Sequence, residues 1–237
     1  MKEKMKKKIL ITIVVIIAII LAIGVGKLVQ DINEEKKLTE EFEEISKLIE
    51  EDEIKFDEIN EILNRTVAKK DYAIVEKAVK TWYSDFVNNA KEMLDILNDE
   101  KLVKILSAEN IKTDGPEFNS TKEYISNTKQ KLESCKVTYY ELAKEEKIMS
   151  YINDKNLDEY YIDYYKKEIF ADVEQEQKDK TVENSLNEII DLLEKSEKII
   201  DFLIENKEKW QFENETLMFD TQALANKYNE LLEEISK

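Results

Sequence analysis

Histidine is absent from this chain of 237 residues, and cysteine occurs once, at Cys135. Without histidine the chain cannot build a Ser-His-Asp triad, a Cys-His dyad, an HExxH zinc site or the Glu-x-x-His metal sites of ferritin-like bundles. One cysteine cannot form an intramolecular disulfide, and Cys135 stands on an apolar helical stripe, where a small buried side chain is expected. We therefore expect no catalytic residues, no metal and no cofactor, and a protein that is not an enzyme.

Glycine and proline are also scarce, with three glycines and one proline in the whole chain. A β-rich or α/β domain of this length needs many residues with positive or restricted φ to make its turns. The scarcity of glycine excludes the Gly-rich loops that bind nucleotides, and a net charge of −17 disfavours nucleic acid as a partner. Residues that favour helices, such as Glu, Lys, Leu and Ile, are abundant, so the composition predicts an all-α fold.

One long apolar run stands out from this charged sequence, because residues 9–26 carry no charge and a single hydroxyl, at Thr12. As a helix such a run is about 27 Å long, close to the hydrocarbon thickness of a bilayer. The lysine-rich segment before it indicates a cytoplasmic N-terminus. The run therefore predicts a single-pass protein of the cell membrane, with a cytoplasmic tail (1–8), a transmembrane signal-anchor helix (9–27) and an extracytoplasmic helical bundle (28–237).

A cleaved signal peptide is the alternative interpretation of the same segment. The small residues of Ala22-Ile23-Gly24 fit cleavage after residue 24, which would release a secreted form. The length of the apolar core favours the uncleaved anchor. In that anchor, Ala18, Ala22 and Gly26 recur every four residues and would form a small-residue face for dimerisation, although such residues are also common in membrane helices.

Apolar periodicity divides the rest of the chain into helices. Predicted helices run from residue 31 or 38 to 65, over 71–97, over 120–149, through the tyrosines near 160–170, over 181–206 and over 220–235. Seams such as Leu38, Phe42, Ile45 and Ile49 alternate spacings of four and three, as in a coiled coil. Residues 109–119 form the clearest loop, and a capping-box pattern from Ser120 opens the next helix. We expect an antiparallel helical bundle.

The pattern changes near the C-terminus. Apolar and other residues alternate in 210–212 and again in 217–219, on either side of Asn214-Glu215. Both a short hairpin and an extended strap fit this alternation, so the segment predicts extended structure within a helical protein.

Four tyrosines within six residues form the most unusual local cluster: Tyr160, Tyr161, Tyr164 and Tyr165. Their spacing puts Tyr160 and Tyr164 on one helix face, and Tyr161 and Tyr165 on the next. Phenol rings combine apolar area with a hydroxyl, so such a surface suits recognition of a partner. The alternative is core packing with the hydroxyls at the rim.

Two further groups of residues are candidates for a site. Trp82 and Phe86, on the helix over 71–97, would line a cavity for an apolar or aromatic ligand together with the tyrosines. Asp52 and Glu146 interrupt otherwise apolar seams. A carboxylate buried there would need a partner or a raised pKa, whereas a carboxylate at a helix edge would face solvent.

These observations predict a non-enzymatic partner-binding or structural module of a bacterial cell envelope. The bacterial assignment rests on the lysine bias, with Arg65 as the only arginine, and on abundant Asn, Ile and Tyr, which are typical of AT-rich genomes. The expected partners are the membrane and a protein, with a homo-oligomer as an alternative. The alternative function is a sensor or carrier subunit that holds a small apolar or aromatic ligand.

Overall fold

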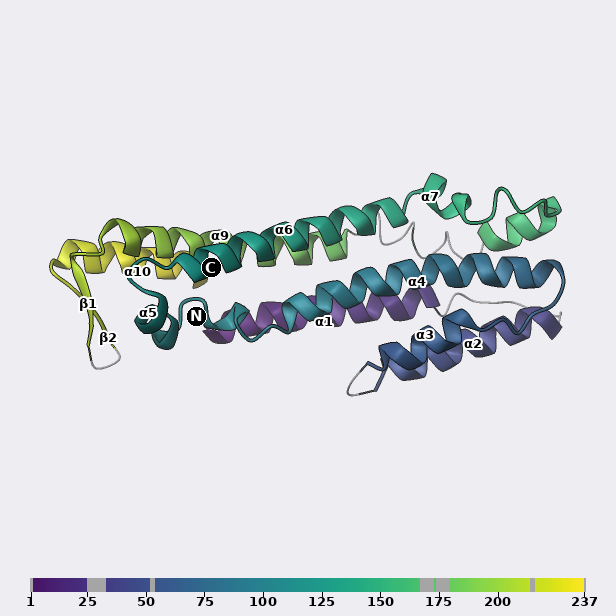
Figure 1. The fold of residues 1–237 in the computed structure, drawn as a ribbon, viewed down its shortest axis with the longest axis horizontal. Coiled ribbons are helices and arrows are strands. Elements are labelled where there is room, and N and C mark those ends of the chain that lie inside the picture. The colour runs from purple at the N-terminus through teal and green to yellow at the C-terminus, as the bar shows by residue number, and fades with distance from the viewer. Residues whose placement is uncertain are drawn as a thin grey trace. The chain divides into compact units, whose positions relative to one another are not determined.

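The computed structural model describes residues 2–24, 33–51, 54–166, 173, 180–213 and 216–236. These residues are mostly helical, and the strands among them form one two-stranded sheet, which confirms the all-α prediction. In chain order the elements are α1 (Lys2–Gly24), α2 (Asn33–Ile49), α3 (Phe56–Asn64), α4 (Asp71–Leu97), η1 (Leu102–Lys104), α5 (Ala108–Asp114), α6 (Asn119–Leu142), α7 (Glu145–Ser150), α9 (Thr181–Glu205), β1 (Trp210–Glu213), β2 (Thr216–Phe219) and α10 (Gln222–Ser236) (Figure 1). Residues 159–166 form a further helical segment.

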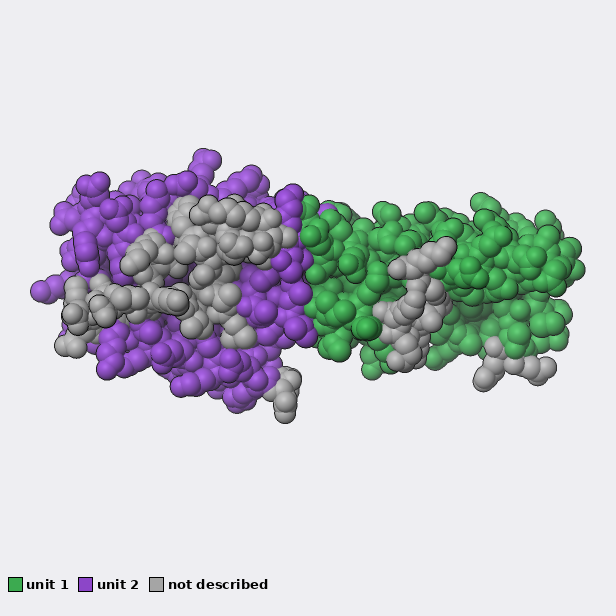
Figure 2. Space-filling view, turned by 180° about the vertical axis from the view of Figure 1, so that it is seen from behind, with its two compact units in different colours: residues 1–13, 94–134, 183–237 green, residues 14–93, 135–182 purple. Residues whose placement is uncertain are grey.

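The chain divides into two compact units, which Figure 2 colours separately. Unit 1 comprises residues 1–13, 94–134 and 183–237, and unit 2 comprises residues 14–93 and 135–182. Each unit gathers segments that are far apart in the sequence. For that reason no change of composition along the chain marks the boundary between the units.

The N-terminal helix α1 has one buried face and one exposed face, although its residues from Ile9 onward are apolar on all sides. The buried side chains are Met5, Ile9, Thr12 and Ile16. The exposed apolar side chains are Leu10, Ile11 and Val14, with exposed fractions of 60%, 50% and 56%. The buried positions follow the spacing of one helix face, so α1 contributes a stripe to the core.

Polar contacts in unit 1 join α1 to α9. Lys8 forms an ion pair with Glu188, with 3.5 Å between Nζ and Oε2. The Thr12 hydroxyl lies 3.1 Å from the Lys8 carbonyl and 3.4 Å from the Ser185 carbonyl, and it donates toward both. Since numbers rise along α1 as they fall along α9, the two helices are antiparallel here.

No helix in the described part of the chain has both the length and the apolar character needed to cross a membrane. The prediction of a transmembrane helix at 9–27, and with it the single-pass location in the cell membrane with the N-terminus inside and the rest outside, is therefore wrong. The physical reason is that an apolar run of this length also suits a helix that buries a face in protein, as Ile9 and Ile16 do. Of the predicted dimer face, Ala18 is exposed, Ala22 lies in α1, and Gly26 lies outside the described residues.

Unit 1 is built on the antiparallel helices α6 and α9 (Figure 1). Lys122 pairs with Asp201 at 2.6 Å, and Lys129, two turns further along α6, pairs with Glu197 at 2.5 Å. Residue numbers rise along α6 as they fall along α9, which is the antiparallel arrangement that the sequence predicts. Both helices bury large apolar side chains completely, among them Ile125, Leu132, Leu193 and Ile200.

The C-terminal hairpin of unit 1 consists of β1 and β2, paired antiparallel with Trp210 opposite Phe219. This pairing confirms the predicted hairpin and excludes the strap. The Trp210 indole N–H donates a hydrogen bond of 2.7 Å to the Leu203 carbonyl. The Phe219 ring contacts Phe202 of α9 at 6.0 Å between centroids. The hairpin is therefore tied to the end of α9.

In unit 2 the helices α4 and α6 are also antiparallel, and two buried donors join them. The Trp82 indole N–H donates to the Leu142 carbonyl at 2.9 Å, and Asn89 Nδ2 donates to the Cys135 carbonyl at 3.1 Å. Cys135 is 1% exposed, as expected for a small side chain on an apolar stripe. Each hydrogen bond satisfies a polar group that burial would otherwise make costly.

The helix that the sequence predicts from 31 or 38 to 65 is divided in two. Helix α2 ends at Ile49 and α3 begins at Phe56, and the Lys55 N–H donates to the Leu48 carbonyl at 3.4 Å. In the sequence the apolar stripe of α2 meets a charged residue at its next position after Ile49, which is Asp52, so the face that the helix buries is interrupted there. The predicted seam position Asp52 lies outside the described residues.

The connection between α5 and α6 also differs from the prediction. Residues 109–119 are helical as far as Asp114, rather than a loop throughout. The Asp114 carboxylate accepts hydrogen bonds from the Ser120 N–H (3.3 Å) and the Thr121 N–H (2.7 Å). A side chain from the preceding helix thus caps α6, in place of the predicted capping box. Helix α6 then ends at Leu142, before the predicted limit of 149.

Gly115 occupies a position where the space, rather than the backbone conformation, requires glycine. Its φ of −72° and ψ of 157° are accessible to any residue. A Cβ atom at this position would lie 2.4 Å from the Ile111 carbonyl oxygen, 3.0 Å from the Phe118 ring and 3.2 Å from the Trp210 ring. The close approach of these groups therefore depends on the missing side chain.

We predict that Gly115→Ala destabilises the protein. The lower entropy of the unfolded chain would contribute about 0.4–1 kcal/mol in favour of alanine. Overlap with a backbone carbonyl costs about 1–3 kcal/mol, so the clash dominates. Urea unfolding followed by circular dichroism measures the difference. The control Lys112→Ala changes an exposed residue of α5 and should alter stability by less than about 0.5 kcal/mol. A Gly115→Ala variant as stable as the unchanged protein would contradict the argument.

Candidate functional site

The tyrosines at 160–165 separate into surface and core positions. Tyr160 is 55% exposed, Tyr161 and Tyr164 are half-buried, and Tyr165 is fully buried. Tyr72, in the first turn of α4, joins the first three of them. Its ring centroid lies 5.1 Å from Tyr161 and 5.9 Å from Tyr164, and its hydroxyl lies 3.3 Å from that of Tyr160. We call Tyr72, Tyr160, Tyr161 and Tyr164 the tyrosine surface.

The other predicted aromatic residues lie in the core of unit 2. The Tyr165 hydroxyl donates a hydrogen bond of 2.7 Å to the Ile148 carbonyl, and burial raises its pKa. Trp82 and Phe86 are 1% and 4% exposed and stack with their centroids 5.8 Å apart, and Phe86 also contacts Tyr139. The six residues singled out in the sequence are therefore divided between a surface group and buried groups.

A cluster of charged side chains lies in the core of unit 2, and we call Glu41, Arg65, Glu76 and Lys80 the ion cluster. Lys80 is 2% exposed, Glu76 is fully buried, and Glu41 is 7% exposed. The Lys80 ammonium lies 2.8 Å from a carboxylate oxygen of Glu41 and 2.8 Å from one of Glu76. It also donates to the carbonyls of Ile62 (3.1 Å) and Arg65 (3.0 Å). Four acceptors surround three hydrogens, so the buried charge is fully satisfied.

The carboxylates of the ion cluster hold the backbone that connects α3 to α4. Glu76 accepts hydrogen bonds from the Val67 N–H (3.0 Å) and the Ala68 N–H (2.7 Å). Arg65 donates to both oxygens of Glu41, at 2.8 Å from Nε and 2.7 Å from Nη2, a bidentate pair of fixed geometry. The ion cluster therefore joins α2, the end of α3, the connecting segment and α4.

Charge is retained in this buried setting. Burial alone would raise the pKa of Glu41, but the hydrogen bonds from Arg65 and Lys80 outweigh it and lower that pKa below its usual value. The hydrogen bond to Glu41 raises the pKa of Arg65. Since the ammonium of Lys80 is buried and fully engaged, the ion cluster is suited to specifying structure rather than to binding a ligand or transferring a proton.

The sequence carries a signal for the ion cluster that lies outside the predicted sites. Glu76 and Lys80 are four residues apart on the face of the 71–97 helix that also carries apolar residues, and Arg65 is the only arginine. The interrupted apolar stripes indicate Asp52 and Glu146 instead. Glu146 is exposed, which fits an edge position, and Asp52 lies outside the described residues.

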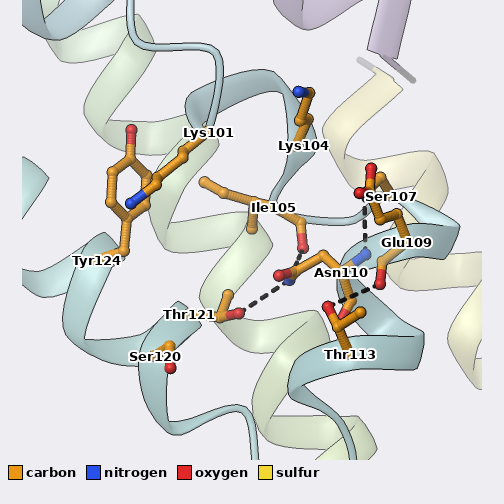
Figure 3. A pocket seen from close by; sticks show the side chains of 10 residues that line it. All are labelled: Lys101, Lys104, Ile105, Ser107, Glu109, Asn110, Thr113, Ser120, Thr121 and Tyr124. Carbon is orange, nitrogen blue, oxygen red and sulfur yellow. Dashed lines mark hydrogen bonds between the residues drawn. The ribbon is translucent and has the colours of Figure 1, made fainter.

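A pocket of about 260 Å³ in unit 1 brings together side chains from three neighbouring segments (Figure 3). Lys101 and Lys104 come from the η1 region, Asn110 from α5, and Tyr124 from α6. We call it the lysine pocket. The ammonium of Lys101 lies 6.0 Å from the centroid of the Tyr124 ring. Burial, together with the carboxylate of Asp99, raises the pKa of the Tyr124 hydroxyl.

The Asn110 amide in the lysine pocket is held by a chain of hydrogen bonds. Its Nδ2 donates to the Ile105 carbonyl at 2.7 Å and to the Thr121 hydroxyl oxygen at 2.8 Å. The Thr121 hydroxyl donates in turn to Asp114 at 2.6 Å. Asp114 therefore both caps α6 and orients a pocket side chain. The sequence offered no sign of this pocket, because its residues follow no motif.

A second pocket of unit 1, of about 380 Å³, lies beside the hairpin and presents both polar and apolar surface. Its lining includes Ile111, Phe212, Leu217, Phe219 and Tyr228. Its residues come from α5, both strands and α10. It is therefore separate from Trp82 and Phe86, around which the sequence placed a ligand.

Within the described residues, no group of three or more Cys, Asp or Glu side chains is placed to hold a metal ion. Comparison with known proteins adds no functional assignment. No protein-family model matches the chain, and no curated protein or solved structure matches it. The functional argument therefore rests on the geometry of the chain itself.

Lys80→Met should destabilise unit 2 strongly. The substitution keeps much of the side-chain volume but leaves the buried carboxylates of Glu41 and Glu76 without their shared cation, which costs about 3–5 kcal/mol. Urea unfolding followed by tryptophan fluorescence, in a Trp210→Phe background that leaves Trp82 as the only tryptophan, measures the loss. Lys77→Met changes an exposed lysine of the same helix and should leave stability within about 0.5 kcal/mol. Equal effects of the two substitutions would show that the ion cluster does not stabilise the fold.

The contribution of Glu41 to stability should depend on pH. Its pKa in the folded protein lies below 4.5, the ordinary value for a glutamate. Its contribution is therefore complete above pH 4.5 and is lost as the pH falls through the lower, folded pKa. Compared with Glu41→Gln, the unchanged protein should be more stable by about 3 kcal/mol near neutral pH, and the gap should narrow below pH 4.5. Urea titrations at several pH values test this, and a gap that stays constant down to pH 3 would refute it. Glu43→Gln, an exposed neighbour, serves as control.

Proposed function

We propose that this protein is a non-enzymatic, helical protein-binding module and that the tyrosine surface is its contact site. The observation that carries the proposal is the exposure of Tyr160, which at 55% presents most of a large aromatic side chain to solvent. It does so beside Tyr72 and Tyr161 instead of packing into the core. Tyrosines in such clusters are typical anchors of protein interfaces.

The rigidity of the tyrosine surface supports this role. Its rings meet edge to face, with Tyr160 and Tyr161 5.3 Å apart at 82° and Tyr72 and Tyr161 5.1 Å apart at 84°. Tyr72 precedes Glu76 and Lys80 by one and two turns of α4, so the ion cluster holds the helix that carries it. Side chains already held in place lose little conformational entropy on binding, which favours affinity.

The charges around the tyrosine surface indicate the chemistry of the partner. Exposed carboxylates flank it in the sequence: Asp71, Asp158, Glu159 and Asp163. The chain as a whole carries a net charge of −17. A partner that offers an apolar contact surrounded by basic residues would match both features, because complementary charges speed association and disfavour other partners.

Site-specific photocrosslinking tests the proposal. With p-benzoylphenylalanine in place of Tyr160, irradiation of cells that make the protein should give a discrete adduct with another protein. The matched control carries the same group in place of Val137, which is exposed to 57% in the same unit. Adding Tyr161→Ser should weaken the adduct by at least tenfold, since truncating a central interface tyrosine costs about 2 kcal/mol or more. Circular dichroism checks that the fold is kept.

Equal crosslinking at 160 and 137, or an adduct that Tyr161→Ser leaves unchanged, would contradict the proposed contact site. An adduct of the chain with itself would assign the tyrosine surface to a homo-oligomer. The second candidate, a carrier of a small aromatic or apolar ligand, is supported by the pocket of about 380 Å³ beside the hairpin, whose lining includes Phe212, Leu217 and Phe219. That volume lies within the usual range for small-molecule sites, about 300–1,000 Å³.

A further inference from the structure

We propose that the lysine pocket of unit 1 binds a small organic carboxylate that also carries a hydrogen-bond donor. The pocket offers cations, a fixed acceptor and an apolar wall within about 260 Å³ (Figure 3). The proposal is independent of the tyrosine surface, because every residue that it uses belongs to unit 1.

The cationic side of the pocket is formed by Lys101 and Lys104. Lys101 forms no ion pair with any described residue, and its ammonium lies 6.0 Å from the centroid of the Tyr124 ring. Lys104 pairs with Glu100 at 2.8 Å, but both side chains are well exposed, so this pair is weak and a ligand can compete for the lysine. The lining also contains one carboxylate, that of Glu109, so its two lysines outnumber its acidic residues. In a chain with a net charge of −17, that excess makes a local preference for an anion.

The acceptor is the side-chain carbonyl of Asn110. Thr121 donates its only hydroxyl hydrogen to Asp114, so toward Asn110 it can act only as an acceptor. The Ile105 carbonyl is also an acceptor. Both contacts require the Nδ2 side of the amide, which fixes its orientation and leaves Oδ1, unengaged by any described residue, to face a ligand.

A small molecule that carries both a carboxylate and a hydrogen-bond donor would use the lysines and the Asn110 acceptor together. The carboxylate would lie against Lys101 and Lys104, and a hydroxyl or N–H of the ligand would donate to Asn110. The Tyr124 ring and Ile105 provide the apolar wall. Since a water molecule occupies about 30 Å³ in the liquid, the volume admits a ligand of on the order of ten non-hydrogen atoms.

The experiment titrates the full chain with 4-hydroxybenzoate and observes the probe by saturation-transfer NMR. A ligand of this size should bind with a Kd in the millimolar range. Lys101→Met and Lys104→Met should each raise the Kd about tenfold, the effect of losing a hydrogen bond to a charged group. Lys112→Met, an exposed lysine of α5 outside the pocket lining, should leave the Kd unchanged.

Three related probes separate the parts of the proposal. The neutral 4-hydroxybenzamide should bind at least tenfold more weakly, because it lacks the charge, and benzoate should also bind more weakly, because it lacks the donor. The proposal is overturned if 4-hydroxybenzoate shows no saturable binding, if 4-hydroxybenzamide binds as well, or if the two pocket lysine variants behave like Lys112→Met. Tighter binding of inorganic phosphate than of 4-hydroxybenzoate would overturn the assignment to carboxylates.

Discussion

Lys80 places the strongest single constraint on this structure, because a charge that is 2% exposed must find an acceptor for each of its hydrogens. Its acceptors come from α2, from the end of α3 and from α4, and Glu76 extends the same contacts to the segment between α3 and α4. A shift of any one of these segments would leave a charge or a backbone group buried without a partner. The ion cluster thus favours one arrangement of unit 2 over other ways of packing the same apolar faces.

Polar contacts also favour one particular arrangement of the helices in unit 1. Asp114 caps α6 and, through Thr121, orients Asn110, so one carboxylate links the beginning of a helix to the geometry of a pocket. Gly115 beside it allows the Phe118 and Trp210 rings to approach. In both units the apolar stripes bring helices together, and a few hydrogen-bonded groups decide how the helices end and which side chains face outward.

Local periodicity accounts for what could be predicted. The helices at 71–97 and 181–206 were predicted within about one residue of α4 and α9, and the hairpin was one of two options for 210–219. The division of the first helix after Ile49 and the helical start of the segment after Ser107 were missed, since both depend on contacts with other elements. The tyrosines near 160 were recognised as a group, but the addition of Tyr72 and the burial of Tyr165 depend on the packing of helices distant in sequence.

The sequence by itself determined that this protein is helical, because too few glycines and prolines are present to make the turns of a β fold. It also excluded chemistry that requires histidine. Only the tertiary structure decided which face of α1 is buried, which carboxylates enter the core and which tyrosines reach the surface. The spacing of apolar residues predicts that one face of a helix will be buried. It does not predict which element buries that face, because this depends on contacts between segments far apart along the chain. The apolar run of α1 illustrates this, because the same residues suit a bilayer and a protein core. The run by itself does not determine which of the two environments it enters.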